Sequence, residues 1–116
     1  MDREPLKLNA FFAIAGDDTD FVKQLLIALS HELELFQKTI NDVANVESVE
    51  NLRKAAHKIQ PGLKMLEQTS LLDAIDRYKD AYTTAGEPTV NVSSTAHTLR
   101  NEVALLLDNI RFFCNS

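Results

Sequence analysis

The chain has 116 residues, of which 45% are hydrophobic and 25% are charged, and its net charge is −5 at pH 7. These are ordinary values for a globular domain, and the acidic balance argues against nucleic acid or an anionic membrane as the main partner. Three Gly and three Pro provide few turn residues, which disfavours an all-β fold. We therefore expect a single domain over residues 1–116 with one core.

The sequence contains no apolar run long enough to span a bilayer, and its start, Met1-Asp2-Arg3-Glu4-Pro5, is too polar for a signal peptide. The single cysteine, Cys114, cannot form an internal disulfide and is expected to be a surface thiol. These features predict a cytoplasmic protein without membrane insertion.

The first predicted element is a short helix from about Pro5 to Ala15, ended by Gly16. Its apolar residues are Leu8, Phe11, Phe12 and Ile14. We expect this helix to cover one end of the molecule.

A long helix is predicted next, from about Asp18 to Ala44, with Asp17 as its N-cap and Asp20 in its first turn. Apolar residues recur every three or four positions along it, as on a helix buried along one stripe. The stripe consists of Val22, Leu26, Leu29, Leu33, Phe36, Ile40 and Val43, widened by Phe21, Leu25 and Ala28.

Three further helices follow with the same spacing. The helix at about 48–66 carries Val49, Leu52, Ala56, Ile59, Leu63 and Leu66. A shorter helix, capped by Thr69 or Ser70 and ended by the loop Ala85-Gly86-Glu87-Pro88, carries Leu71, Ile75, Tyr78 and Tyr82. The last helix carries Val92, Ala96, Leu99, Val103, Leu106, Ile110 and Phe113. The pattern predicts an all-α fold, an antiparallel four-helix bundle with an additional short N-terminal helix.

Leu105 and Phe112 are seven residues apart and lie off the apolar stripe of the last helix. They are expected to pack against the N-terminal helix, or else to form an exposed patch through which two chains dimerise.

The helix at 48–66 carries the strongest functional signal, which is a histidine among cations. No Asp or Glu occurs from Asn51 to Leu66, whereas four of the twelve Lys and Arg residues do. A helix advances about 100° per residue, so His57 lies about 130° from the centre of the apolar stripe and faces solvent. The residues on its side of the helix are Arg53, Gln60, Pro61 and Lys64, with Lys54 and Lys58 flanking them.

Pro61 interrupts this helix pattern, since Leu63 and Leu66 continue the apolar stripe beyond it. A proline inside a helix has no N–H to donate and crowds the carbonyl four residues earlier, at a cost of about 3 kcal/mol. We expect the helix to bend or loosen at His57, with Gly62 easing the strain.

The segment Ala56-His57-Lys58-Ile59 on the second helix of such a bundle resembles the histidine phosphotransfer (HPt) domain of bacterial two-component phosphorelays. The resemblance covers nearly the whole chain. It implies that His57 accepts a phosphoryl group from an aspartyl phosphate of a receiver domain and relays it to another receiver. The family usually has Lys and Gly three and four residues after the histidine, where this chain has Gln60 and Pro61. Lys64 could supply the missing charge.

The resemblance further implies a phosphoryl carrier rather than an enzyme, because the receiver or a kinase domain catalyses the transfer. The expected partners are response-regulator receiver domains and a hybrid sensor histidine kinase, with Mg²⁺ on the receiver and no cofactor on this chain. The residues expected to support the phosphoryl group or dock the receiver are Arg53, Lys54, Lys58, Gln60, Pro61 and Lys64. A monomer is expected, since a carrier must expose its histidine.

The sequence is also compatible with two alternatives. Ser30-His31-Glu32-Leu33 resembles the start of the phosphoacceptor box of sensor kinases, but the acids around His31 would repel phosphate, so we interpret His31 as a solvated residue. His97 is interpreted in the same way, and no ligand spacing predicts a metal site. The other alternative is a helical docking module that binds signalling proteins and in which His57 is not phosphorylated. Binding by such a module would survive His57→Gln.

Overall fold

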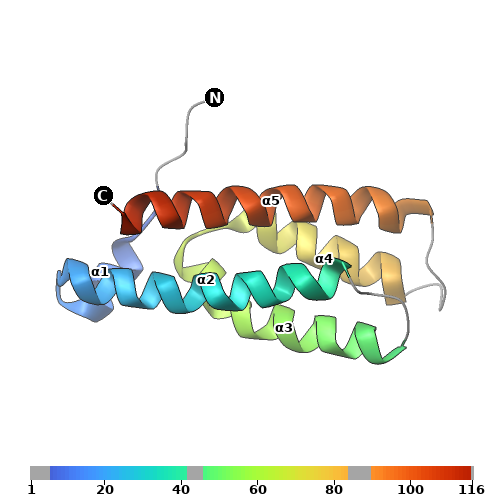
Figure 1. Ribbon diagram of the computed structural model, residues 1–116, viewed down its shortest axis with the longest axis horizontal. Helices are drawn as coiled ribbons and strands as arrows, with labels where there is room; N and C mark the ends of the chain where they lie inside the picture. Colours follow the sequence, from blue (N-terminus) through green and yellow to red (C-terminus); the bar gives the residue numbers. More distant parts are fainter. Residues whose placement is uncertain (1–5, 42–45, 84–89, 116) are drawn as a thin grey trace.

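The structure is a computed structural model that describes the backbone of residues 6–41, 46–83 and 90–115 and the side chains of residues 6–40, 50–78 and 96–115. The described residues form five helices: α1 (Asn9–Ala15), α2 (Thr19–Asn41), α3 (Val46–Met65), α4 (Thr69–Thr83) and α5 (Val90–Cys114). Consecutive long helices run in opposite directions, and α1 lies at the end of the bundle where α5 finishes (Figure 1). The predicted four-helix bundle with a short N-terminal helix is confirmed.

The four long helices form a closed ring of contacts, in which α2 and α4 each pack against both α3 and α5. The residues predicted from the apolar spacing form the core wherever their side chains are described. The buried members are Val22, Leu26, Leu29, Leu33, Phe36, Ile40, Leu52, Ala56, Ile59, Leu63, Leu66, Leu71, Ile75, Tyr78, Ala96, Leu99, Val103, Leu106 and Ile110. The predicted positions of Val43, Val49, Tyr82 and Val92 lie outside the described side chains.

The stripe of α2 is narrower than predicted. Leu25 is half-buried, but Phe21 and Ala28 are exposed. Within the ring, α2 is covered only by α3 and α5. Side chains that lie about 100° or more around the helix axis from the centre of the stripe therefore remain in solvent.

The predicted helix starts require correction. Helix α1 begins at Asn9 rather than near Pro5, because Leu6 and Leu8 pack against the core in a non-helical conformation. The N-cap of α2 is Asp18, whose Oδ1 accepts a hydrogen bond of 3.2 Å from the N–H of Phe21. Asp17 cannot take this position, because its φ of 66° is left-handed and an N-cap residue is extended. Gly16 ends α1 as predicted, with φ 62°.

The turn between α3 and α4 also differs from the prediction. Thr69 and Ser70 are the first residues of α4 rather than its cap. The Ser70 hydroxyl donates to Glu102 of α5 over 3.0 Å, so it ties two helices together. The predicted end of the first long helix near Ala44 and the loop Ala85-Gly86-Glu87-Pro88 lie outside the described residues.

Gly62 has a packing role that the sequence did not reveal. A Cβ at this position would lie 2.8 Å from Cδ1 of Leu29, so the missing side chain lets α3 approach α2 closely. This contact fixes which side of α3 faces α2.

Leu105 and Phe112 are exposed on α5, with exposed fractions of 52% and 62%. The prediction that they pack against the N-terminal helix is therefore wrong, because an apolar residue buried in such a contact would lose most of its exposure. Among the described helices, none is both long and apolar enough to cross a membrane.

Candidate functional site

His57 lies near the middle of α3 and its side chain is exposed, as the helical geometry predicted. The six other residues predicted around it are also exposed on the same helix. They are Arg53, Lys54, Lys58, Gln60, Pro61 and Lys64. The apolar side of α3 meanwhile faces the core, so one helix both stabilises the bundle and displays the candidate site.

The two flanks of α3 have different neighbours. Gly62 meets Leu29 of α2, which places one flank against α2. On the other flank, a small pocket of about 130 Å³ lies between α3 and α4 and is lined by Ala56, Gln60, Lys64, Leu72, Ile75 and Asp76. His57 lies within about 60° of Gln60 and about 20° of Lys64 around the helix axis. The histidine therefore lies on the outer side of α3, next to the flank that faces α4, and it does not line the pocket.

The fold brings an acid next to this part of α3 that the sequence pattern did not indicate. Asp76, exposed on α4, lines the same pocket as Gln60 and Lys64. A second acid lies on α3 itself, where Glu50 Oε2 is 4.0 Å from Arg53 Nη1. Residues 51–66 contain no acid, as expected, but in the folded protein Glu50 and Asp76 lie next to this segment.

Pro61 does not end α3, which continues to Met65. Because proline has no N–H, the carbonyl oxygen of His57 receives no helical hydrogen bond from residue 61. The pyrrolidine ring of Pro61 is exposed, so the proline presents a rigid apolar surface within the basic segment. The predicted bend at His57 stays a prediction.

The other two histidines lie on different helices from His57. His31 is exposed on α2, and His97 is exposed on α5 with Nε2 3.3 Å from Nδ2 of Asn101. None of the three histidines lines the pocket beside Lys64. No group of three metal-ligating side chains occurs among the residues whose positions are described.

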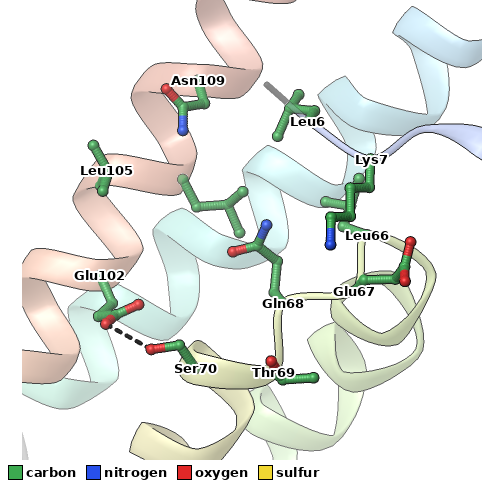
Figure 2. A pocket seen from close by; sticks show the side chains of 11 residues that line it. Leu6, Lys7, Leu66, Glu67, Gln68, Thr69, Ser70, Glu102, Leu105 and Asn109 are labelled. Carbon is green, nitrogen blue, oxygen red and sulfur yellow. Dashed lines mark hydrogen bonds between the residues drawn. The ribbon is translucent and has the colours of Figure 1, made fainter. Parts of the chain in front are cut away.

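A larger hollow, of about 390 Å³, lies at the end of the bundle where α3 turns into α4 (Figure 2). Figure 2 shows Lys7, Gln68 and Asn109 around it, together with the hydrogen bond from Ser70 to Glu102. No histidine or cysteine lines this hollow. It therefore offers no nucleophile of the kind that His57 provides.

Asn109, on the wall of this hollow, was not identified from the sequence. The residue is buried, and its Oδ1 has no hydrogen-bond partner. Its signal was nevertheless present, because Asn109 adjoins Ile110 and lies three residues after Leu106, both members of the apolar stripe. A polar residue at the edge of a buried stripe normally needs a hydrogen-bond partner, so such a position can be identified from the sequence.

Cys114 is half-buried rather than a surface thiol. Its Sγ lies 3.8 Å from the carbonyl oxygen of Lys23 at the start of α2. Burial raises the pKa of the Cys114 thiol, and the positive charge of Lys23 opposes this shift in part. The thiol is therefore less reactive than a free cysteine.

Comparison of the chain with protein-family models, with curated proteins and with solved structures gives no match.

Proposed function

We propose that this protein is a histidine-containing phosphotransfer protein that carries a phosphoryl group on His57. The donor is an aspartyl phosphate on a response-regulator receiver domain, and the acceptor is the aspartate of another receiver. The observation that carries the proposal is the exposure of His57 on a bundle helix together with four exposed cations, Arg53, Lys54, Lys58 and Lys64.

The proposed chemistry needs only what α3 displays. An imidazole ring nitrogen attacks phosphorus, the N–P bond forms, and the bond from phosphorus to the aspartyl oxygen breaks, leaving its electron pair on the carboxylate. In the second transfer the N–P bond breaks and the imidazole regains its lone pair. The receiver brings the Mg²⁺ and the acidic pocket, so His57 acts as a nucleophile and leaving group on a partner's catalytic site.

The cations on α3 support two parts of this proposal. They attract a receiver whose site is acidic, which favours encounter and orientation more than affinity. They also offset the charge of the phosphoryl group once it is on the histidine. In this proposal the Gln60 amide donates a hydrogen bond to a phosphoryl oxygen but contributes no charge. Lys64, which lines the same pocket as Gln60, supplies the positive charge.

The second candidate is a docking module for signalling proteins that uses the same face without phosphorylation. Gln60 and Pro61 favour it, since both stand where the resembled family usually has Lys and Gly. A docking face needs exposed charge and a rigid apolar surface but no nucleophile.

Phosphotransfer from a panel of phosphorylated receivers tests the proposal. The acid-labile phosphate on the chain is mapped by mass spectrometry in the wild type, His57→Gln, His31→Gln and His97→Gln. We expect label in every protein except His57→Gln. Label lost only in His31→Gln would place the acceptor on α2. A folded wild type that receives no label, and that binds receivers as well with His57→Gln, would identify the docking module.

A further inference from the structure

We propose that two copies of this protein form a weak antiparallel dimer through the outer face of α2. This face is a set of exposed side chains of one helix, namely Asp20, Phe21, Gln24, Ala28, His31, Leu35 and Lys38. The inference goes beyond the proposed function, because it concerns a surface of α2 that does not include His57.

The outer face of α2 carries an apolar stripe. Phe21 and Leu35 retain exposed fractions of 42% and 51%, and Ala28, midway between them in the sequence, is also exposed. Seven residues make nearly two helical turns, so the three side chains lie within about 20° of one line along α2. An apolar repeat of seven residues on an exposed helix favours pairing with another helix. The small side chain of Ala28 at the centre lets the axis of the second helix approach closely.

The apolar stripe is complementary to itself when two copies of α2 run in opposite directions. With a twofold axis at Ala28, Phe21 of each copy lies opposite Leu35 of the other. Each large side chain of the stripe is then covered by a large side chain of the second copy. A twofold contact of this kind closes on itself, so it produces a dimer rather than a chain of molecules.

The charges beside the stripe favour the same arrangement. Asp20 is in the first turn of α2 and Lys38 is in the last, and both lie about 80° around the helix from Ala28, on the same flank. The midpoint between them falls one residue, or about 1.5 Å, from the centre of the apolar stripe. The antiparallel pairing therefore brings Asp20 of each copy near Lys38 of the other, whereas a parallel pairing would place like charges opposite each other.

The other described charges of α2 do not oppose this pairing. Lys23 and Glu34 lie on the flank next to α5, where Glu34 forms an ion pair of 2.9 Å with Arg111. Glu32 is half-buried on the flank opposite to Asp20. Its two copies would lie about 12 Å apart along the helix axis, which exceeds the Debye length of about 8 Å at physiological salt.

The exposed apolar pair on α5 lacks this complementarity. Leu105 and Phe112 could also face each other in an antiparallel contact, with its centre between residues 108 and 109. Asp108 is exposed at that centre, about 50° from the line through the two apolar side chains. The two copies of Asp108 would then lie on the same flank at almost the same level, where their charges repel. The outer face of α2 is therefore the better surface for a second copy.

A dimer through α2 leaves the candidate site open. Gly62 marks the flank of α3 that packs against α2. His57 is five residues earlier and lies about 140° around α3 from that flank. A copy of the protein on the outer face of α2 is thus compatible with the exposure of His57 that the proposed function requires.

The expected dimer is weak, because a contact of two helix faces with two large apolar side chains in each copy belongs to the small, transient class of interfaces. We expect a dissociation constant between about 1 μM and about 1 mM. Sedimentation equilibrium of the full chain from about 10 μM to about 1 mM measures it. A monomeric mass throughout this range would overturn the proposal.

Leu35→Glu tests the surface, with Leu105→Glu as its matched control. The two leucines have exposed fractions of 51% and 52%, so both substitutions place the same charge at equally exposed sites. We expect Leu35→Glu to raise the dissociation constant at least about tenfold, because each copy loses a buried contact, and Leu105→Glu to leave it nearly unchanged. Circular dichroism checks that both variants are folded. An effect of Leu105→Glu alone, or equal effects of the two variants, would overturn the assignment to α2.

Charge reversal tests the antiparallel direction. Asp20→Lys and Lys38→Asp should each weaken self-association by about three- to tenfold, because two attractive pairs become repulsive. In a mixture of the two variants each protein supplies the charge that the other lacks. We therefore expect the mixture to form a heterodimer with a dissociation constant close to that of the wild type, measured by sedimentation with one variant labelled. A mixture that associates no better than the separate variants would overturn the antiparallel pairing.

Discussion

At the scale of single residues, the identity of a side chain and its surroundings decide what it can do. His57, His31 and His97 are all exposed, so exposure does not distinguish them. What distinguishes His57 is the set of exposed cations around it on α3. His31 instead has Glu32 and Glu34 beside it in the sequence.

Asn109 offers a test of stability at this scale. A buried polar atom without a partner costs about 1–3 kcal/mol, and Oδ1 of Asn109 is such an atom. We expect Asn109→Leu to raise the free energy of unfolding by about 1 kcal/mol, measured by urea denaturation. Asn109→Asp serves as the control and should lower it, because it places an ionisable group in the same buried position. A Leu variant less stable than the wild type would contradict this account.

Cys114 offers a test of reactivity. Because burial raises its pKa, a smaller fraction of the thiol is ionised in the folded protein than in the unfolded chain. We expect iodoacetamide to alkylate Cys114 more slowly in native protein than in urea-unfolded protein at pH 8. The folded protein keeps the thiol proton to a higher pH than the unfolded chain does. The contribution of the protonated thiol to the free energy of unfolding is therefore present at neutral pH and is lost as the pH rises above about 8.5. Equal alkylation rates in both states would refute the burial argument.

At the scale of the helices, α3 combines requirements that conflict. Its apolar side packs on the core, its outer side is basic, and Pro61 stands inside it. An interior proline removes one helical hydrogen bond. This conflict is of the kind found where function competes with stability.

Pro61→Ala tests that conflict. The substitution restores an N–H that can donate to the carbonyl of His57, so we expect the free energy of unfolding to rise by about 1–3 kcal/mol. Thermal and urea unfolding measure the gain, and phosphotransfer to His57 measures its consequence. If the variant is no more stable than the wild type, the surroundings of Pro61 already compensate for the missing bond.

Gly62 makes a second prediction about α3. A Cβ there would crowd Leu29, although the nearest atoms are the ends of a flexible side chain. Gly62→Ala should therefore change stability little, because better helix propensity offsets the crowding. Gly62→Leu should destabilise by about 1–3 kcal/mol, since the larger side chain separates α3 from α2. Equal stability of the two variants, measured by urea unfolding, would mean that α2 and α3 can move apart freely.

The bundle itself could be predicted from the sequence because its signal is periodic and local. Every described position of the main stripes is buried or half-buried, which needs only the repeat of the α-helix. Helix ends were less predictable. Leu8 has an apolar side chain that fits a helix, but it packs against the core from a non-helical residue. Choosing between Asp17 and Asp18 as a cap requires the backbone angles of the turn.

At the scale of the whole molecule, the candidate site was predictable only along one helix. The orientation of His57 and its cations follows from the helical repeat of α3 alone. Asp76 could not be placed beside Gln60 and Lys64 from the sequence, because its position depends on how α4 packs against α3. The exposure of Leu105 and Phe112 likewise depends on where α1 lies. Contacts between helices were the part that periodicity did not determine.

The proposed function requires that His57 accept a phosphoryl group while the bundle holds its side chain exposed. The most direct measurement is the ³¹P NMR spectrum of the full chain after treatment with phosphoramidate, compared between the wild type and His57→Gln. We predict an acid-labile phosphoramidate resonance in the wild type that is absent from a fully folded His57→Gln variant. The same resonance in both proteins, or in neither, would contradict the claim.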